Sequence, residues 1–309
     1  MHETRTAGPA ATSGRIEGPA WNLSSEYPSI ASKEYLADLA TLESELVDIE
    51  AMGASAGLRA EAAASLDPVQ DATFAVELSR FAVADEGVRA RLYNLRVYAN
   101  CVLATDAGDA EAAAMRGKLE GCASRLAAAA ASLTLILVMA PEPFFESFCC
   151  LPETGRFRFA LEQQRKDRAR ALPLPAERAL ATMSADGLHA WGALYDTITG
   201  SLRCRVRGLD GAEASVGLAK AASLLKRPEP EIRESAWRGI NAALSRHQDT
   251  FAAILNAISG WRGSEGSLRS HTEPVQYLDA ALRQSRISRA TLDALMGVLR
   301  ESRETGRRA

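Results

Sequence analysis

Histidine side chains with suitable neighbours are the first feature that could do chemistry in this sequence. The four histidines are His2, His189, His247 and His271. A zinc-binding H-E-x-x-H motif needs two imidazoles one helical turn apart, and no two of these histidines are that close. The pair His271 and Glu273 has the H-x-E spacing of zinc deaminases, but no P-C-x-x-C follows it. The residues therefore predict no metal site in this chain.

Nucleophile and phosphate-binding motifs are missing from the sequence as well. It contains no G-x-S-x-G, no G-x-x-x-x-G-K and no G-x-G-x-x-G. Ser223 and Lys226 fit the S-x-x-K spacing formally, but they stand in a leucine-rich segment without a partner motif. Gly260, Gly263 and Gly266 are better explained by a helix end and a loop than by a phosphate cradle. From the residues alone we assign no catalytic, cofactor-binding or metal-binding residue.

The cysteines indicate a reducing environment. Their number is odd and no C-x-x-C occurs, so reduced and mostly buried thiols are the favoured interpretation. The N-terminal residues contain no apolar segment of the kind a secretory signal has. We therefore expect a cytoplasmic protein. The five cysteines are Cys101, Cys122, Cys149, Cys150 and Cys204.

The charge balance argues against a nucleic-acid partner. The formal net charge is -3, whereas a general nucleic-acid binder is usually basic. The densest basic stretch lies within residues 156–170, and Glu162 and Asp167 interrupt it. We interpret this stretch as a solvated helix face rather than a phosphate-binding patch.

The composition predicts a mostly helical protein. Of 309 residues, 58 are alanine, which loses no side-chain entropy in a helix. Prolines are few and clustered. An all-β sandwich or barrel and a disulfide-stapled mini-domain are therefore excluded.

Apolar periodicity places the helices that would have to position any site. A helix capped by Ser32 is predicted to run to about Met52, because its apolar residues recur every three or four positions. A second is predicted from Asp67-Pro68 to about Thr105 with a break near residues 85–87, and a third from residue 108 to Ala140. These three long helices should be antiparallel and joined by short connections.

The second half of the chain is predicted to be helical as well, apart from one hairpin. Helices are expected over residues 176–182 and 186–202, and a β-hairpin near residues 202–216 with Asp210-Gly211 at its turn. One long helix is then expected from residue 231 to about Trp261, ended by glycines, and a last one over residues 288–302.

The weakly polar run from Leu126 to Ala140 is the only stretch that needs comparison with a membrane span. It is about fifteen residues long and rich in alanine, whereas a spanning helix needs about twenty strongly apolar residues. We expect a buried core helix and no membrane partner.

Several segments together resemble the oligoendopeptidase F family, the bacterial relatives of thimet oligopeptidase. Their order and spacing carry the resemblance, since no one of them is decisive. The segments begin Trp21-Asn-Leu-Ser, Leu92-Tyr-Asn-Leu-Arg, Trp191-Gly-Ala-Leu-Tyr, Pro230-Glu-Ile-Arg-Glu, His247-Gln-Asp-Thr-Phe and Gln284-Ser-Arg-Ile-Ser.

The resemblance implies the N-terminal half of a zinc metalloendopeptidase that hydrolyses short peptides. In this family the H-E-x-x-H helix and the other zinc ligands lie in the second half, so zinc is a cofactor of the full-length family but none is expected in this chain. The chain is expected to be truncated before the metal motif, inactive alone, and to supply one wall of the substrate channel. Its expected partners are short peptides and a separately encoded C-terminal half.

The predicted domain organisation follows from the same resemblance. We expect a disordered tail over residues 1–20, an N-terminal helical domain over 21–217, and the start of a peptidase domain over 218–309. The alternative is a non-catalytic helical module that binds peptides or a protein partner. Whether the chain is an enzyme is left open by the sequence. Because the helix expected from residue 231 is apolar on several sides, we expect the part after about residue 217 to lack packing neighbours.

Overall fold

The computed structural model describes residues 22–308. The tail predicted over residues 1–20, and Trp21, lie outside the described residues. Within residues 22–308 the regular secondary structure is helical apart from one two-stranded antiparallel sheet. The predicted class, all-α with one small β-hairpin, is confirmed.

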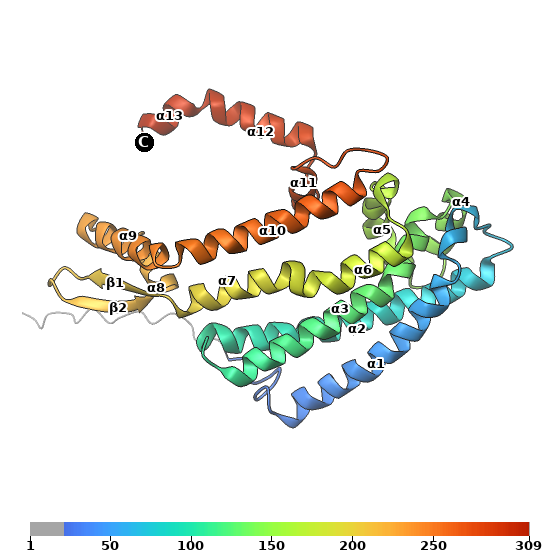
Figure 1. The fold of residues 1–309 in the computed structure, drawn as a ribbon, viewed down its shortest axis with the longest axis horizontal. Coiled ribbons are helices and arrows are strands. Elements are labelled where there is room, and N and C mark those ends of the chain that lie inside the picture. The colour runs from blue at the N-terminus through green and yellow to red at the C-terminus, as the bar shows by residue number, and fades with distance from the viewer. Residues whose placement is uncertain (1–21, 309) are drawn as a thin grey trace, which may run out of the picture.

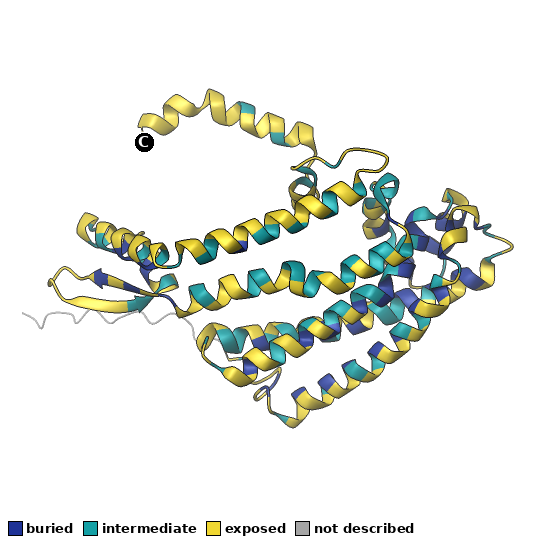
Figure 2. Cartoon of the chain, viewed as in Figure 1, coloured by how far each residue is buried: buried dark blue, intermediate teal, exposed yellow. Residues whose placement is uncertain are grey.

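Three long helices form the main core of the molecule (Figure 1). They are α1 (Lys33–Gly57), α2 (Ala72–Thr105) and α3 (Ala110–Met139), and α3 packs against both of the others. Ser32 caps α1 as predicted, because its side chain accepts a hydrogen bond from the backbone N–H of Tyr35. Figure 2 shows that most buried residues belong to these helices and to the segment that follows them.

The connections around α2 differ in two ways from the sequence prediction. The 3₁₀ helix Ala60–Ser65 and a turn come first, and α2 begins at Ala72 rather than at Asp67. The carboxylate of Asp67 accepts hydrogen bonds from the N–H groups of Val69 and Gln70, so it closes that turn instead of capping a helix. The predicted break near residues 85–87 is wrong, since α2 is continuous there.

Helices α1 and α3 approach very closely at Gly53. A Cβ atom at this position would lie 2.4 Å from the carbonyl oxygen of Ala129. The carbonyl of Gly53 accepts hydrogen bonds from the hydroxyl of Ser132 and from the guanidinium of Arg178, each at 2.9 Å. A glycine is needed here because the two backbones leave no room for a side chain.

Arginines of the basic stretch close the C-terminal end of α3. After α4 (Glu142–Cys149) and the 3₁₀ turn Gly155–Phe157, helix α5 (Arg158–Arg165) and the 3₁₀ turn Arg168–Arg170 run beside it. The guanidinium of Arg165 donates to the carbonyls of residues 137, 138 and 140, and that of Arg168 donates to the carbonyl of residue 139. The last turn of a helix leaves such carbonyls without partners. These two arginines are therefore part of the packing, and the expectation of a solvated face is wrong for them.

A long helical segment packs along α3. It consists of α6 (Leu174–Ser184), the π-helical segment Ala185–His189 and α7 (Ala190–Ser201). At the π-helical segment, a Cβ on Gly187 would lie 2.3 Å from the ring of Trp261. The indole of Trp261, from α10 (Gln248–Arg269), therefore packs against the wide turn of the π-helical segment.

The predicted hairpin is present, with strands β1 (Arg203–Arg207) and β2 (Glu213–Gly217). Gly211 has φ +76° in the connecting loop, where Asp210-Gly211 was expected. The buried side of β1 carries Cys204 and Val206, which form a second, smaller core with α8 (Leu218–Leu224) and α9 (Pro230–Ser245). The predicted domain boundary at residue 217 stays a prediction.

The single helix expected from residue 231 to 261 is wrong. The chain breaks at Arg246-His247 into α9 and α10, and α10 continues past the glycines to Arg269. The break follows from tertiary packing, because α9 lies on β1 whereas α10 lies along α7 and the π-helical segment. Gly260 and Gly263 have open space where a side chain would be, so they interrupt nothing.

The chain ends in an arm with little packing of its own. It comprises α11 (Asp279–Ser285), α12 (Arg289–Glu301) and α13 (Arg303–Arg308), and none of these helices has a buried residue. Figure 1 shows that α12 and α13 run back above α10 and α9 without lying on them. The predicted helix over 288–302 is confirmed as α12.

Among the described residues, α3 alone has the length and apolar composition that could cross a membrane. More than half of its apolar stretch is buried inside the fold, as in the core helix of a soluble protein.

Candidate functional site

The three histidines within the described residues stand in different segments, and His2 lies outside these residues. His189 is exposed at the end of the π-helical segment, and His247 precedes α10 beside Phe251. His271 is exposed in a loop, with Nε2 3.1 Å from the carbonyl oxygen of Ala171. Within residues 22–308, no three His, Cys, Asp or Glu side chains gather closely enough to hold a metal ion. The expectation that this chain carries no catalytic, cofactor or metal ligand remains a prediction.

The other residues considered for chemistry have structural partners. The hydroxyl of Ser223 donates to the carbonyl of Lys220 in α8, 2.7 Å away, and Lys226 is exposed after that helix. All five cysteines carry free thiols, and burial raises the pKa of Cys122 and Cys149. A thiol with a raised pKa is a poor nucleophile at neutral pH.

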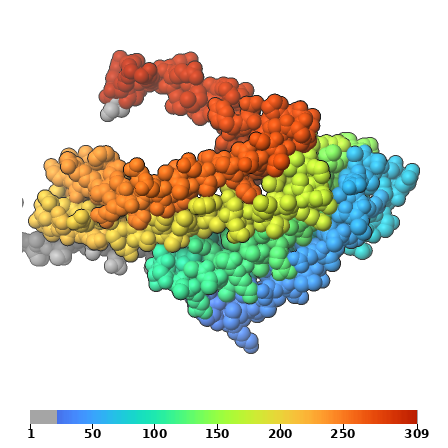
Figure 3. Space-filling model, viewed as in Figure 1, coloured from blue at the N-terminus to red at the C-terminus, as the bar shows by residue number. Residues whose placement is uncertain are grey.

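The clearest surface feature is a hollow between the C-terminal arm and the helices below it. Figure 3 shows it between α12–α13 on one side and α9–α10 on the other. On α12, Leu292, Leu295, Met296 and Leu299 recur at helical spacing and so share one face. Leu295 is 53% exposed and Leu299 55% exposed. We call this apolar stripe the α12 face.

Helices α9 and α10 also expose large apolar side chains. Trp237 on α9 is 60% exposed, and Leu255 on α10 is 64% exposed. Burying one such side chain contributes roughly 1.5 to 3 kcal/mol. Large apolar residues that share one exposed helix face mark a surface that binds a partner, so the α12 face is the first candidate for a binding surface. Helices α9 and α10 lie across the hollow from it.

Ion pairs hold the base of the arm on the bundle. Arg170 pairs with Asp279 of α11 at 2.9 Å, and Arg283 pairs with Asp167 at 3.0 Å. At the end of α10, Arg269 donates both terminal nitrogens to the carboxylate of Glu177, and these hydrogen bonds raise its pKa. The α12 face is therefore presented from a fixed base.

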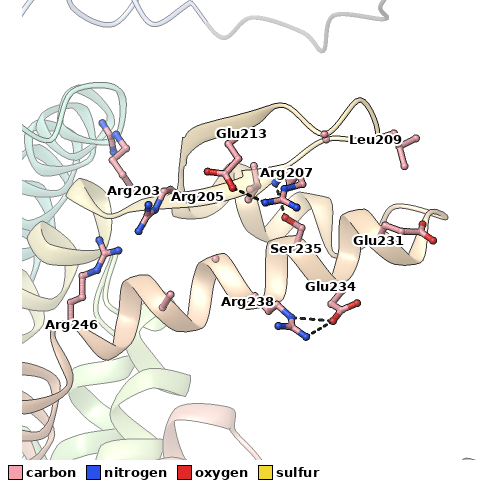
Figure 4. A pocket seen from close by; sticks show the side chains of 15 residues that line it. Arg203, Arg205, Arg207, Leu209, Glu213, Glu231, Glu234, Ser235, Arg238 and Arg246 are labelled. Atoms are coloured by element: carbon pink, nitrogen blue, oxygen red, sulfur yellow. Dashed lines mark hydrogen bonds and ion pairs between the residues drawn. The ribbon is translucent and has the colours of Figure 1, made fainter.

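A groove between the hairpin and α9 is the second candidate. It has a volume of about 730 Å³ and is lined along the exposed side of β1 by Arg203, Arg205 and Arg207. The α9 side contributes Glu231, Glu234, Arg238 and Arg246 (Figure 4). Helix and strand approach closely, because a Cβ on Gly239 would lie 2.2 Å from the carbonyl oxygen of Arg205. We call this the arginine groove.

Sequence reasoning missed the arginine groove. The signal was present as arginines at every second residue of a predicted strand, which places them on one face. The contribution of α9 was not visible, because it depends on how that helix packs against the strand.

Comparison with known proteins gives the class of the fold. Residues 137–203 match the family model described as Oligopeptidase F. The crystal structure of oligoendopeptidase-F from Enterococcus faecium aligns with a TM-score of 0.62 and 17% identity, over 84% of this chain and 49% of that one. A candidate peptidase from Chlamydophila abortus aligns with a TM-score of 0.48 and 16% identity, over 74% of this chain and 38% of that one. No curated protein matches the chain in sequence.

These findings confirm the resemblance predicted from the sequence. The chain has the helical fold of the N-terminal region of oligoendopeptidase F, and residues 137–203 match the model of that family. It spans about half the length of the E. faecium protein.

Proposed function

We propose that this chain is the N-terminal, substrate-channel half of an oligoendopeptidase F-like zinc metalloendopeptidase that hydrolyses short peptides. The observation that carries the proposal is the fold match over 84% of this chain to one half of oligoendopeptidase-F. The family match at residues 137–203 supports it independently from sequence. A cytoplasmic location is part of the proposal, since five free cysteines suit a reducing compartment.

The proposed role of this half is to form one wall of the substrate channel, while the other half catalyses peptide hydrolysis. In the full-length family, a zinc ion supplies the polarised water that attacks the peptide carbonyl. The described residues offer no cluster that fits such an ion, so we assign no step of the reaction to them. What they offer is a rigid set of long helices with α9 and α10 along one side of the hollow.

The α12 face is the proposed docking surface for the metal-binding half. Its apolar stripe is exposed on a helix without a buried residue, and its base is fixed by the ion pairs of α11. An amphipathic helix of this kind gains its stability from a partner that covers its apolar face. The metal-binding half, joined to this chain or separately encoded, would supply that cover.

The second candidate is a non-catalytic helical module that binds peptides or a protein partner. The exposed apolar residues on α9, α10 and α12 favour it, since such a surface also fits a partner of another kind. The two candidates differ in whether the partner brings a zinc-binding H-E-x-x-H helix.

Reconstitution tests the proposal against this alternative. The DNA that follows this coding sequence in the genome is read in all frames for a segment with H-E-x-x-H. That segment is co-expressed with this chain, once with wild-type α12 and once with L295D and L299D.

The proposal expects a stable complex with the wild-type chain and its loss with the double variant. A control on the side of α12 away from the stripe, D293A and E301A, should leave the complex intact. No such segment, or no complex with it, favours the non-catalytic module.

A further inference from the structure

Three guanidinium groups at the inner end of the arginine groove have no carboxylate partner. Among the described residues, Arg203, Arg205 and Arg246 form no ion pair. Figure 4 shows them gathered at one end of the groove, away from the hairpin turn. All three side chains are exposed and therefore accessible to a ligand.

The other arginines of the groove are neutralised. Arg207 pairs with Glu213 at 3.0 Å, and Arg238 pairs with Glu234 at 2.6 Å. Positive charge is thus left over at the inner end of the groove alone. Glu231 also has no ion-pair partner among the described residues, and Figure 4 places it at the opposite end.

The inner end is also built to hold its charges in place. One terminal nitrogen of Arg203 faces the carbonyls of Ser201 and Leu202, at 3.3 and 3.2 Å, which leaves its other N–H groups free. Arg205 rises from the middle of β1, where the backbone is held against α9 by a hydrogen bond from the N–H of Arg207 to the hydroxyl of Ser235. Gly239 lets α9 approach β1 closely, and Ala242 lines the groove with a small side chain.

The charge pattern fits a short peptide and not a polyanion. Positive charge stands at one end and the carboxylate of Glu231 at the other, whereas a nucleic acid or a polyphosphate would be repelled by Glu231 further along the groove. A guanidinium offers paired N–H donors that match the two oxygens of a carboxylate. The groove volume of about 730 Å³ lies in the range of sites for small ligands.

We propose that the arginine groove binds the C-terminal carboxylate of a short peptide through Arg205 and Arg246, with the peptide extending toward Glu231. This inference rests on the proposed function, because it takes short peptides as the ligands of the chain. It adds a site and a direction of binding. A peptide whose free carboxylate is bound in this way is held by its end, which selects short peptides over internal segments of long chains.

Binding of two matched peptides tests the inference. A short fluorescein-labelled peptide with a free C-terminus and its C-terminal amide are titrated with the full chain, and fluorescence anisotropy is measured. The free acid should bind about tenfold to a hundredfold more tightly than the amide, the ratio of one or two charge-assisted hydrogen bonds. Raising the salt concentration should lower the affinity of the free acid more than that of the amide.

Two double variants separate the groove from general charge effects. R205A with R246A should reduce the preference for the free acid to within about twofold, a difference below one hydrogen bond. The control R80A with R308A removes two exposed arginines elsewhere and should keep the full preference. Circular dichroism of each variant shows whether it is folded.

Several results would overturn the inference. These are equal binding of acid and amide, an unchanged preference in R205A with R246A, and no binding of either peptide. Displacement of the peptide by inorganic phosphate but not by acetate at equal ionic strength would assign the groove to phosphates and also overturn it. The proposed function is judged separately by the reconstitution experiment, which does not depend on this groove.

Discussion

The closest helix crossing in the bundle predicts opposite effects for one substitution at two sites. Gly53→Ala adds a methyl group that would lie 2.4 Å from the carbonyl oxygen of Ala129 on α3. Ordinary van der Waals contact for a Cβ begins near 3.4 Å, so α1 and α3 must separate by about 1 Å. Gly121→Ala, in the middle of α3, places the same methyl group where nothing lies within 4 Å.

The magnitudes follow from the two environments. Replacing glycine by alanine inside a helix stabilises by about 1 kcal/mol, and this gain applies to both variants. At Gly53 it is offset by overpacking of about 1 to 3 kcal/mol. Weakening of the hydrogen bonds that its carbonyl accepts from Ser132 and Arg178 costs about 1 kcal/mol more. We expect Gly53→Ala to lower the free energy of unfolding by about 1 to 3 kcal/mol and Gly121→Ala to raise it by about 0.5 to 1 kcal/mol.

Urea unfolding followed by circular dichroism measures both values, with the slope of the transition as a check that the same surface is exposed on unfolding. Gly53→Ala as stable as the wild type would show that α1 and α3 are not in backbone contact, and the description of the core would be wrong. A loss of stability in Gly121→Ala of the same size would show that the effect does not come from the crossing.

Three further predictions concern the bundle and the arm. Arg165→Met should lower the free energy of unfolding by about 2 to 3 kcal/mol, because three carbonyls at the end of α3 lose a charged donor. The control Arg156→Met, which removes an exposed pair with Glu86, should cost under about 1 kcal/mol in the same urea experiment, and equal losses would contradict the capping role. Burial raises the pKa of Tyr35 from 10.0 to about 12, so the folded state holds this proton more tightly than the unfolded state does. The stability that Tyr35 contributes should therefore be fully present below pH 10 and be lost between pH 10 and 12. In thermal unfolding over this range, the stability of Tyr35→Phe should fall less steeply than that of the wild type. An equally steep fall would refute this prediction. Among residues 22–308, limited proteolysis with mass mapping should cut first within 218–308, where few side chains are buried, and leave α1 to α3 uncut. First cuts inside α1 to α3 would contradict this order.

The helices of the bundle were predictable from the sequence because their side chains alternate between core and solvent. Leu39, Leu42 and Leu46 of α1 recur at helical spacing, and all three are buried. The hairpin was predictable for the same reason, since Cys204 and Val206 alternate with arginines along β1. Local pattern and tertiary packing agree in these elements.

Features that depend on distant contacts were not predictable. No local signal marks the break at Arg246-His247, which separates a helix that packs on β1 from one that packs along α7. The π-helical segment likewise depends on Trp261, more than seventy residues further along the chain. Whether an arginine of the basic stretch caps a helix or faces solvent depends on where the end of α3 lies.

The candidate site shows the same limit. The sequence predicted a resemblance to oligoendopeptidase F and an exposed apolar surface in its last part; a family match over residues 137–203, the fold match and the exposed side chains of α9, α10 and α12 agree with this. It did not predict the arginine groove, because Arg203 and Arg205 come from β1 and Arg246 from the end of α9. Each of these arginines alone is an ordinary surface residue.

The central claim is that this chain forms part of a peptide channel and supplies none of the catalytic chemistry. The most direct measurement follows a quenched fluorescent short peptide with the purified chain over a titration of added zinc, and determines bound zinc in the same samples. The account predicts that the peptide is recovered intact and that bound zinc stays far below one ion per chain. One tightly bound zinc ion per chain, with cleavage that a chelator abolishes, would contradict it.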